Sequence, residues 1–415
     1  MKKTAKKKKR SPAIRRKLPD VAVIGAGAFG GWTALHLLRL GARVTLIDAW
    51  GAGHARGTSS DHSRIIRCGY GAHDLYTRWT WRALKLWREF EGQERVSVFN
   101  NCGVLWLARE EDDYTRASLA ALAKLKIPVE RFSAVELLRR YPQLYAEDVR
   151  VAYFEPRGGY LRARNATVAV ANAVARHQRG RVVQAAASPP ATGHLRPATS
   201  RPTSVGLQEL ALLDGPALRA GAFVFACGPW LPQLFPDVLG SRVRVTKQEV
   251  FYFGVPAADN RFSPKFLPPW IEVSEPFYGI PAGDGCGLKV ADDTSFVPFD
   301  PTSGERTVAP RRLDEARQYL ARRFPSMASA PLVEAKVCQY ERTPDRHLVV
   351  DRHPEYDNVW LAGGGSGHGF KLGPAVGEFV AGHVLGRPGE PIPPELRLGA
   401  TAFADSADFG VPRSI

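Results

Sequence analysis

Three glycines near the N-terminus have the spacing of a phosphate-binding turn. Gly25, Gly27 and Gly30 form G-x-G-x-x-G after an apolar run at 21–24. In such a turn the first glycine permits the bend, the second lets the backbone approach a pyrophosphate, and the third lets the helix pack on the strand. Asp48 ends the next apolar run and could accept a hydrogen bond from a ribose hydroxyl. These residues predict adenine-dinucleotide binding, with FAD and NAD both open.

The elements that must hold this turn are spread along the chain. A second apolar run at 359–362 is followed by the glycine-rich letters GGGSGHGF. Two such strand ends so far apart predict one nucleotide domain assembled from distant segments. Residues 243–300 are strand-like and interrupted by Pro and Gly, which favours an antiparallel sheet in a second domain. Helices are predicted over 74–91, 113–125, 133–139, 165–177, 313–324 and 374–385, and further strands over 43–47, 96–108, 151–154 and 222–226.

The composition restricts the class of protein. The 415 residues carry a net charge of +16, and positions 1–18 hold ten basic residues and no acidic one. We expect a disordered, solvated tail there, with contact to nucleic acid or an anionic surface as the alternative. No apolar run is long enough to span a bilayer, so we expect no membrane span. The basic residues at the N-terminus are not followed by the hydrophobic region of a signal peptide, so we expect no secretory signal. The segment 185–205, rich in Pro, Ala, Ser and Thr, is expected to be a mobile surface excursion.

Cysteine and histidine usage points to an intracellular protein without a metal. The five cysteines are odd in number and contain no C-x-x-C. This predicts a reducing compartment, taken as the cytoplasm, and neither a disulfide framework nor structural zinc. The ten histidines form no H-E-x-x-H pattern, so no metal site is predicted.

Four segments in order resemble a known family. They are GTSSDHSRIIR (57–67), GCGLK (285–289), CQYERTPDRHLVVD (338–351) and GGGSGHGFK (363–371). The chain is similar over about 19–390, with a gap at 185–205, to the FAD-dependent amino-acid oxidase family, especially its sarcosine and N-methyltryptophan oxidase members. The resemblance implies an α/β fold, in which a Rossmann-type FAD-binding domain is interleaved with an α+β substrate domain on a mixed or antiparallel sheet. The implied segments are a tail at 1–18, an FAD-binding domain at 19–88, 152–236 and 340–390, and a substrate domain at 89–151 and 237–339.

The resemblance also implies roles for individual side chains. Cys338 matches a cysteine that forms a thioether to the flavin; seen alone, it could be a small buried apolar residue. Lys289 matches a lysine near flavin N5 that promotes oxygen reduction, although it could also be a solvated lysine at a strand end. Arg67 and Lys371 match the pair that binds the substrate carboxylate, and two cations converging on one anion suit that task.

Further residues around the flavin follow in the same way. Arg64 matches an arginine lying against the flavin, and Tyr278 matches a pocket tyrosine. The remaining implied cofactor contacts are Ser59, Ser60, Gly364, Gly365, Gly367, His368 and Gly369, besides Arg64 and Lys371. Ser60 and Asp293 depart from the sarcosine oxidase pattern, which has histidines in the pocket at both places. The departures indicate a substrate larger or more cationic than sarcosine, unless Asp293 points to solvent or pairs with an arginine.

These implications favour an oxidase of a secondary or primary amino acid. A hydride would pass from the carbon next to nitrogen to flavin N5, the imine would hydrolyse, and O₂ would reoxidise the flavin to give H₂O₂. The main alternative is a dehydrogenase that passes electrons to a quinone or a carrier protein. Hydrolase chemistry at 364–368 is disfavoured, because His368 replaces the last glycine of G-x-S-x-G. A binding role on nucleic acid is the third alternative, and a monomer without membrane contact is expected.

Overall fold

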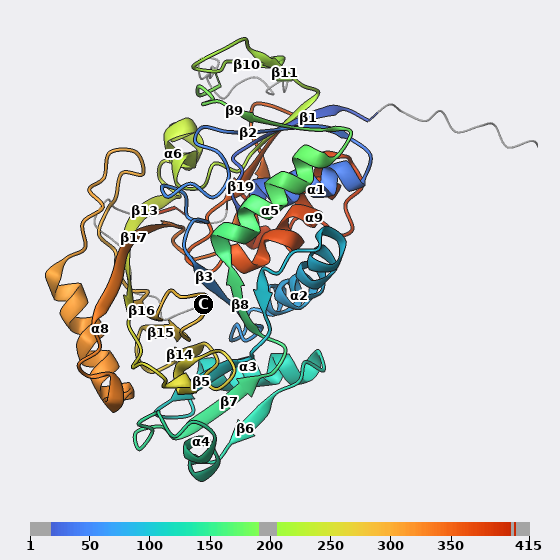
Figure 1. The fold of residues 1–415 in the computed structure, drawn as a ribbon. Coiled ribbons are helices and arrows are strands. Elements are labelled where there is room, and N and C mark those ends of the chain that lie inside the picture. Colours follow the sequence, from blue (N-terminus) through green and yellow to red (C-terminus); the bar gives the residue numbers. More distant parts are fainter. Residues whose placement is uncertain (1–17, 191–205, 400–401, 404–415) are drawn as a thin grey trace, which may run out of the picture.

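The computed structural model describes residues 18–190, 206–399 and 402–403 (Figure 1). The expected basic tail therefore lies outside the described residues except for its last position. Most of the excursion expected at 185–205 lies outside them as well. At the described start of that excursion, Ala187 forms an isolated antiparallel bridge with Leu212.

A six-stranded sheet carries the glycine turn. Its order is β18 (Val349–Arg352), β19 (Val359–Gly363), β12 (Ala222–Phe225), β1 (Asp20–Ile24), β2 (Arg43–Asp48) and β9 (Gly180–Gln184). All neighbours pair in parallel except β18 and β19. Parallel strands covered by helices are buried on both faces, which is why β1 and β12 read as continuous apolar runs. As predicted, one nucleotide-binding sheet is assembled from segments far apart in the chain.

Helices cover this sheet. Figure 1 shows them beside it: α1 (Ala28–Arg39), α2 (Asp74–Glu94), α5 (Ala163–Arg176) and α9 (Gly373–Val384). Helix α1 packs against α5 and α9, and α2 packs against α9. The interface contains an aromatic cluster in which the ring of Trp32 lies 4.9 Å from Trp87 and 5.1 Å from Phe90. The tryptophans of α2 thus serve mainly as core, as their helical spacing indicates.

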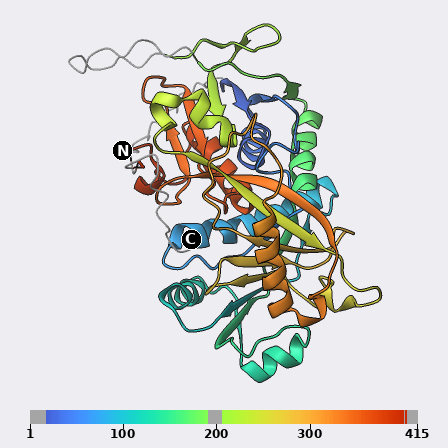
Figure 2. The same cartoon turned by 90° about the vertical axis from the view of Figure 1, so that its left-hand side faces the viewer.

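A second, eight-stranded sheet builds the other half. Its order is β17 (Leu332–Arg342), β13 (Arg244–Phe253), β16 (Leu288–Asp292), β15 (Phe277–Ile280), β14 (Trp270–Glu272), β5 (Val104–Ala108), β7 (Val151–Glu155) and β6 (Glu130–Phe132). Only β14 and β5 are parallel. Helix α8 (Pro310–Arg323) lies along the outer face of this sheet in Figure 2. The mixed sheet confirms the predicted fold class, and the sheet takes in β7, which crosses the domain limit expected at residue 152.

Smaller elements complete the molecule. They are the sheet β3 (Ser63–Ile66), β8 (Gly159–Arg162) and β4 (Phe99–Asn100), the pair β10 (Glu209–Leu210) and β11 (Leu218–Arg219), the helices α3 (Asp113–Lys124), α4 (Ala134–Arg140), α6 (Leu231–Leu234) and α7 (Pro236–Leu239), and 3₁₀ turns at Gly228–Trp230, Asn260–Phe262, Pro325–Met327, Phe370–Leu372 and Pro394–Leu396. Ser133 and Glu136 form a capping box at the start of α4, the helix predicted over 133–139. Among the described residues, no helix combines the length and apolarity needed to cross a membrane.

Candidate active site

The glycine turn has the geometry that the spacing predicts. Gly25 adopts φ +100°, and its N–H donates to the carbonyl of Ile47 over 2.7 Å. A Cβ on Gly25 would lie 2.3 Å from the carbonyl oxygen of Ala226, and one on Gly30 would lie 1.8 Å from that of Gly25. Either side chain would push α1 or β12 away from β1. The glycines therefore fix how closely the helix N-terminus approaches the strand ends.

A cavity of about 440 Å³ lies at these strand ends. A volume of this size is typical of a small-molecule or cofactor site. Of the residues implied by the motifs, Gly25, Gly27, Asp48, Ser59, Arg64, Gly365, Gly367 and Gly369 line it. The carboxylate of Asp48 is fixed at the turn, because it accepts hydrogen bonds from the N–H of Ala26 (2.8 Å) and of Trp50 (3.0 Å).

The lining of the large cavity fits an adenine dinucleotide. Gly27 caps α1 without a side chain of its own; the N–H of Ala28 donates to the Ser59 hydroxyl over 3.1 Å, and the N-terminus of this 12-residue helix faces the cavity, where it suits a phosphate. Trp50 and Trp230, which sequence reasoning missed, place their rings 4.8 Å apart in the same cavity. Beside them, the buried Nδ1 of His54 has no hydrogen-bond partner in the described part of the chain. Aromatic faces and a buried polar atom lacking a partner suit an adenine ring.

Glu341 is an unforeseen acidic residue of this cavity. Its carboxyl is buried and accepts a hydrogen bond from the N–H of Gly364 over 3.1 Å. No ion pair to Glu341 is found within the described residues. Burial raises the pKa of Glu341 to about 7, although the N–H groups of Gly364 and Gly365 oppose this. With a pKa of about 7, the protonated and ionised forms of Glu341 have similar populations at neutral pH.

A smaller cavity of about 110 Å³ adjoins the first one. The two share Arg64, Tyr340, Gly367 and Phe370 in their walls. Arg67 and Lys371 both line the smaller cavity, which we call the substrate cavity. The Lys371 ammonium donates to the carbonyl of His368 over 3.0 Å, and the Arg67 guanidinium lies 4.0 Å from the ring centre of Tyr70.

The electrostatics of the substrate cavity favour an anion. Burial, and next the charge of Arg67, lower the pKa of Lys371 well below its ordinary value. Two cations in one dry pocket repel each other, and a bound carboxylate would relieve that repulsion. Tyr278 from β15 and His368 line the same space, so the structure brings these predicted residues together.

Glu155, another missed residue, fixes the segment that carries Arg67. This buried carboxylate ends β7 and accepts hydrogen bonds from the N–H groups of Cys68 (2.6 Å) and Gly69 (3.0 Å), and from Trp106 Nε1 (2.8 Å). Arg67 in turn donates to the carbonyl of Gly69. The sequence signal was available, because an acidic residue ends an otherwise apolar strand.

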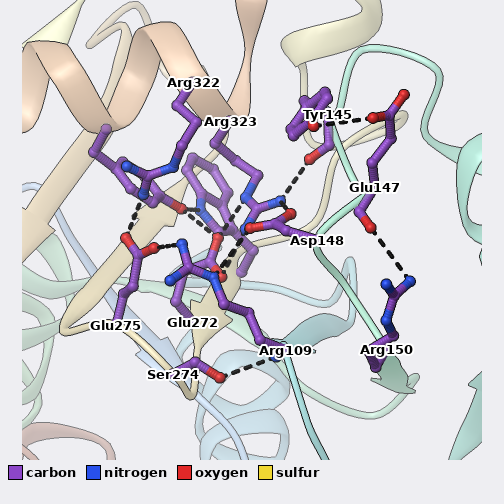
Figure 3. Close-up of polar contacts among 12 residues, drawn as sticks. Arg109, Tyr145, Glu147, Asp148, Arg150, Glu272, Ser274, Glu275, Arg322 and Arg323 are labelled. Carbon is purple, nitrogen blue, oxygen red and sulfur yellow. Dashed lines mark hydrogen bonds and ion pairs between the residues drawn. The ribbon is translucent and has the colours of Figure 1, made fainter.

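The far wall of the substrate cavity is held by ion pairs (Figure 3). Glu272 accepts from Nε of Arg323 over 2.6 Å and from the hydroxyl of Tyr319 over 2.8 Å. Glu275 is paired with both Arg109 and Arg322. Burial raises the pKa of Glu272, and the charge of Arg323 opposes this. Both carboxylates line the cavity with their charges already compensated, so their part is to support the wall.

Lys289 and Cys338 lie behind the cavity walls. The Lys289 ammonium is buried and donates to Asp61 Oδ2 over 2.5 Å and to the carbonyl of Ser63 over 3.1 Å. Arg64 Nη2 lies 3.8 Å from the sulfur of Cys338. Neither Lys289 nor Cys338 is among the residues lining the two cavities. Asp61 was missed although it stands inside one of the family-like segments.

Three other predicted residues do not line either cavity. Gly30 and Gly364 serve close packing, since a Cβ on Gly364 would lie 2.9 Å from Cγ2 of Thr343. The Ser60 hydroxyl donates to the carbonyl of Gly57 over 2.7 Å within its own loop. Ser60 thus forms no part of the wall of either cavity. Asp293, by contrast, does line the substrate cavity.

Comparison with known proteins agrees with this arrangement. A 370-residue stretch is 32% identical to the monomeric sarcosine oxidase of Streptomyces avermitilis, covering 87% of this chain and 92% of that one. An N-methyl-L-tryptophan oxidase of Yersinia pestis is 25% identical over 374 residues, with 87% and 94% covered. The fold resembles that of the L-proline dehydrogenase from P. horikoshii, with a TM-score of 0.77 at 20% identity and with 91% and 96% covered.

The family follows from the match along the chain. The family model described as FAD dependent oxidoreductase (DAO) matches residues 20–382, which takes in both sheets and both cavities. The match confirms the resemblance seen in the four motifs and identifies the dinucleotide as FAD rather than NAD. The chain belongs to the DAO family of FAD-dependent oxidoreductases.

Proposed function

We propose that the protein is an FAD-dependent oxidase of a secondary or primary amino acid and that it produces H₂O₂. The observation that carries the proposal is the pair Arg67 and Lys371, which line a substrate cavity sharing walls with the cofactor cavity. The names of the relatives, oxidases of sarcosine and of N-methyl-L-tryptophan, support an N-methyl amino acid as the substrate class.

The side chains give each part of the substrate a place. Arg67 and Lys371 bind the carboxylate and so orient the carbon next to nitrogen toward the cavity shared with the cofactor. FAD, when bound, supplies the two-electron acceptor for a hydride from that carbon. The amine must be neutral to donate, and the two cations lower its pKa, because like charges disfavour its protonation. The imine released is hydrolysed by water, and O₂ takes two electrons and two protons to become H₂O₂.

Two further roles rest on the family resemblance. Cys338 is proposed as the covalent attachment point of the flavin, and Lys289 as the cation that assists oxygen reduction. In support, Arg64 lines both cavities, lies 3.8 Å from the Cys338 sulfur, and shares the carboxylate of Asp61 with Lys289. The cation of Lys289 would stabilise the anion formed when O₂ takes its first electron.

The proposed substrate is bulkier or more basic than sarcosine. Asp293 lines the substrate cavity, and burial raises its pKa while the charges of Arg346 and Arg342 oppose this. Arg342 also donates to the main-chain carbonyl of Asp293 over 2.6 Å. A carboxylate in this wall complements a cationic or hydrogen-bonding substrate side chain, while Arg67 and Lys371 keep the substrate carboxylate.

The test is an anaerobic titration of the purified yellow protein. Sarcosine, bulky N-methyl amino acids, a cyclic imino acid and a basic amino acid are added, and flavin bleaching is followed at its visible absorption band. Admitting air to the bleached protein should restore the colour and release peroxide in proportion to substrate consumed. If no amino acid bleaches the flavin, the proposed function is wrong.

The alternative function is a dehydrogenase with a quinone or protein acceptor. One observation favours it: the charge of Lys289 is compensated by Asp61, and neither residue lines a cavity. Turnover with an artificial acceptor that exceeds peroxide formation by tenfold or more would select this alternative.

We also propose that the enzyme acts as a monomer in a reducing compartment, where its five unpaired cysteines would persist.

A further inference from the structure

A buried ion cluster centres on Asp61. Its Oδ1 accepts from the hydroxyl of Tyr252 over 2.6 Å, and its Oδ2 accepts from the ammonium of Lys289 over 2.5 Å and from the guanidinium of Arg64. Asp61 and Lys289 are each only 1% exposed. One carboxylate thus holds two cations in a place that water does not reach.

The charges in this cluster depend on one another. Burial, together with the charge of Arg64, lowers the pKa of Lys289, and the charge of Asp61 opposes this. The cations of Lys289 and Arg64 in turn hold the pKa of Asp61 well below its usual range, against the effect of burial. Without the carboxylate, two cations would share a dry site. An arginine cannot give up its proton in a protein, so the lysine would deprotonate.

We propose that Asp61 is a positioning residue that keeps Lys289 protonated and fixed for the reaction with oxygen. The proposal rests on the proposed function, in which Lys289 assists oxygen reduction. Lys289 keeps its proton throughout: both electrons come from the reduced cofactor, and the two protons of H₂O₂ are drawn from reduced cofactor and solvent. The cluster retains a net charge of one positive, because two cations share one anion, and this charge is available to the anion formed first from O₂.

Two phenols and a thiol also face Lys289. Tyr252 and Tyr278 place their ring centres 5.9 and 5.7 Å from its ammonium, and burial raises the pKa of both phenols and of Cys338. In the part of the chain that the structure describes, three partly exposed titratable residues lie beyond Tyr252. They are His62, Glu334 and Lys336, which bond one another.

The first experiment follows reoxidation of the substrate-reduced holoenzyme by O₂ in a stopped-flow instrument from pH 6 to pH 10. The wild-type rate should stay within about twofold across this range. Asp61→Asn should lose tenfold or more between pH 6 and pH 9, because its Lys289 deprotonates. Lys289→Met should be slow at every pH, and the double variant should match Lys289→Met. His62→Gln serves as the control and should follow the wild type.

The second experiment measures the ion pair without turnover. Urea unfolding of the holoenzymes at pH 7 gives a double-mutant cycle for Asp61→Asn and Lys289→Met, and a coupling above tenfold in the unfolding equilibrium constant is expected. If Asp61→Asn does not fold, Asp61→Glu replaces it in the rate measurement. This variant keeps the charge, so its profile should stay flat while its rate falls severalfold.

The outcomes separate this inference from the proposed function. An Asp61→Asn profile as flat as the wild type, or reoxidation faster than the wild type at every pH, would overturn the role of Asp61. A Lys289→Met variant that reoxidises like the wild type removes the oxygen role of Lys289, which belongs to the proposed function. In that case the double-mutant cycle still tests the ion pair between Asp61 and Lys289. A coupling below twofold in the unfolding equilibrium constant would show that Asp61 does not hold Lys289.

Discussion

Lys371→Met should weaken substrate binding and stabilise the protein at the same time. The lysine is buried beside Arg67, and its ammonium donates a hydrogen bond to the carbonyl of His368. Loss of a charge-assisted contact to the substrate carboxylate costs about 1.5–3 kcal/mol, so kcat/KM should fall about 10- to 150-fold. Replacing buried ionic groups with apolar ones of similar volume often gains about 1–4 kcal/mol, and the lost hydrogen bond offsets about 1 kcal/mol of that gain. The free energy of unfolding should therefore rise by roughly 1 kcal/mol or more.

The pH dependence provides the sharper test of this reasoning. The folded protein lowers the pKa of Lys371, so the unfolded chain binds the proton more tightly. Wild-type stability relative to the variant should rise as the pH climbs toward the ordinary lysine pKa, and the gap between the two should close there. Urea unfolding at a series of pH values measures this. Lys85→Met removes a lysine exposed on α2 and should change neither quantity.

Two results would refute this account of the cation pair. One is a Lys371→Met variant that is less stable than the wild type at pH 7, since it would mean that the ammonium is not under electrostatic strain. The other is an unchanged kcat/KM for an amino acid. An amine of the same shape without a carboxylate should react equally with both proteins, which separates carboxylate binding from a general loss of activity.

Three other substitutions test separate parts of the site. Cys338→Ala should release all yellow colour into the supernatant after acid denaturation, whereas the wild type keeps its colour on the chain; colour lost from both proteins would rule out covalent attachment. Asp293→Asn should lower kcat/KM for a basic amino acid at least tenfold more than for sarcosine, and an unchanged ratio, or sarcosine as the best substrate, would contradict the proposed pocket. Glu341→Gln should remove a decline in stability as the pH rises from about 5 through about 7, since burial raises the pKa of Glu341 to about 7 and the folded state then favours the protonated form. The decline should amount to about 3 kcal/mol, because each unit of pKa shift corresponds to about 1.4 kcal/mol of stability; identical urea profiles for both proteins would refute it.

The fold could be predicted because its signals are local or lie in recurrent motifs. The glycine turn, the apolar parallel strands and the capping box of α4 all depend on neighbours in sequence. The family resemblance supplied what local patterns cannot, namely the interleaving of the two sheets. The expected domain limit at residue 152 falls within β7, whereas the whole of β7 pairs with β5 in the eight-stranded sheet. Which strands pair is set by tertiary contacts rather than by the sequence of one strand.

The site could be predicted only where a residue matched a motif. Arg67, Lys371 and Tyr278 were brought together as expected. The carboxylates of Asp61 and Glu155 were not foreseen, because each acts on partners from other elements of the fold. Asp61 bonds a lysine 228 positions away, and Glu155 bonds main-chain groups 86 and 87 positions away. The periodicity of apolar residues indicates the buried face of a single helix or strand. It cannot predict a contact between side chains of elements that are distant in the sequence.

The order of strands in the six-stranded sheet has a consequence for synthesis of the chain. Strand β1 pairs with β2, which follows it at once, and with β12, which ends at Phe225. At about 5–20 residues per second, the backbone groups along one edge of β1 stay unpaired for roughly 10–40 s until β12 has been made. The glycine-rich segment after β19 is made later still. The cofactor cavity is lined by residues up to Phe370, so FAD can be bound only after most of the chain has been translated. Until then the unpaired edge of β1 could pair with another chain, and a chaperone that holds unfolded segments would protect it.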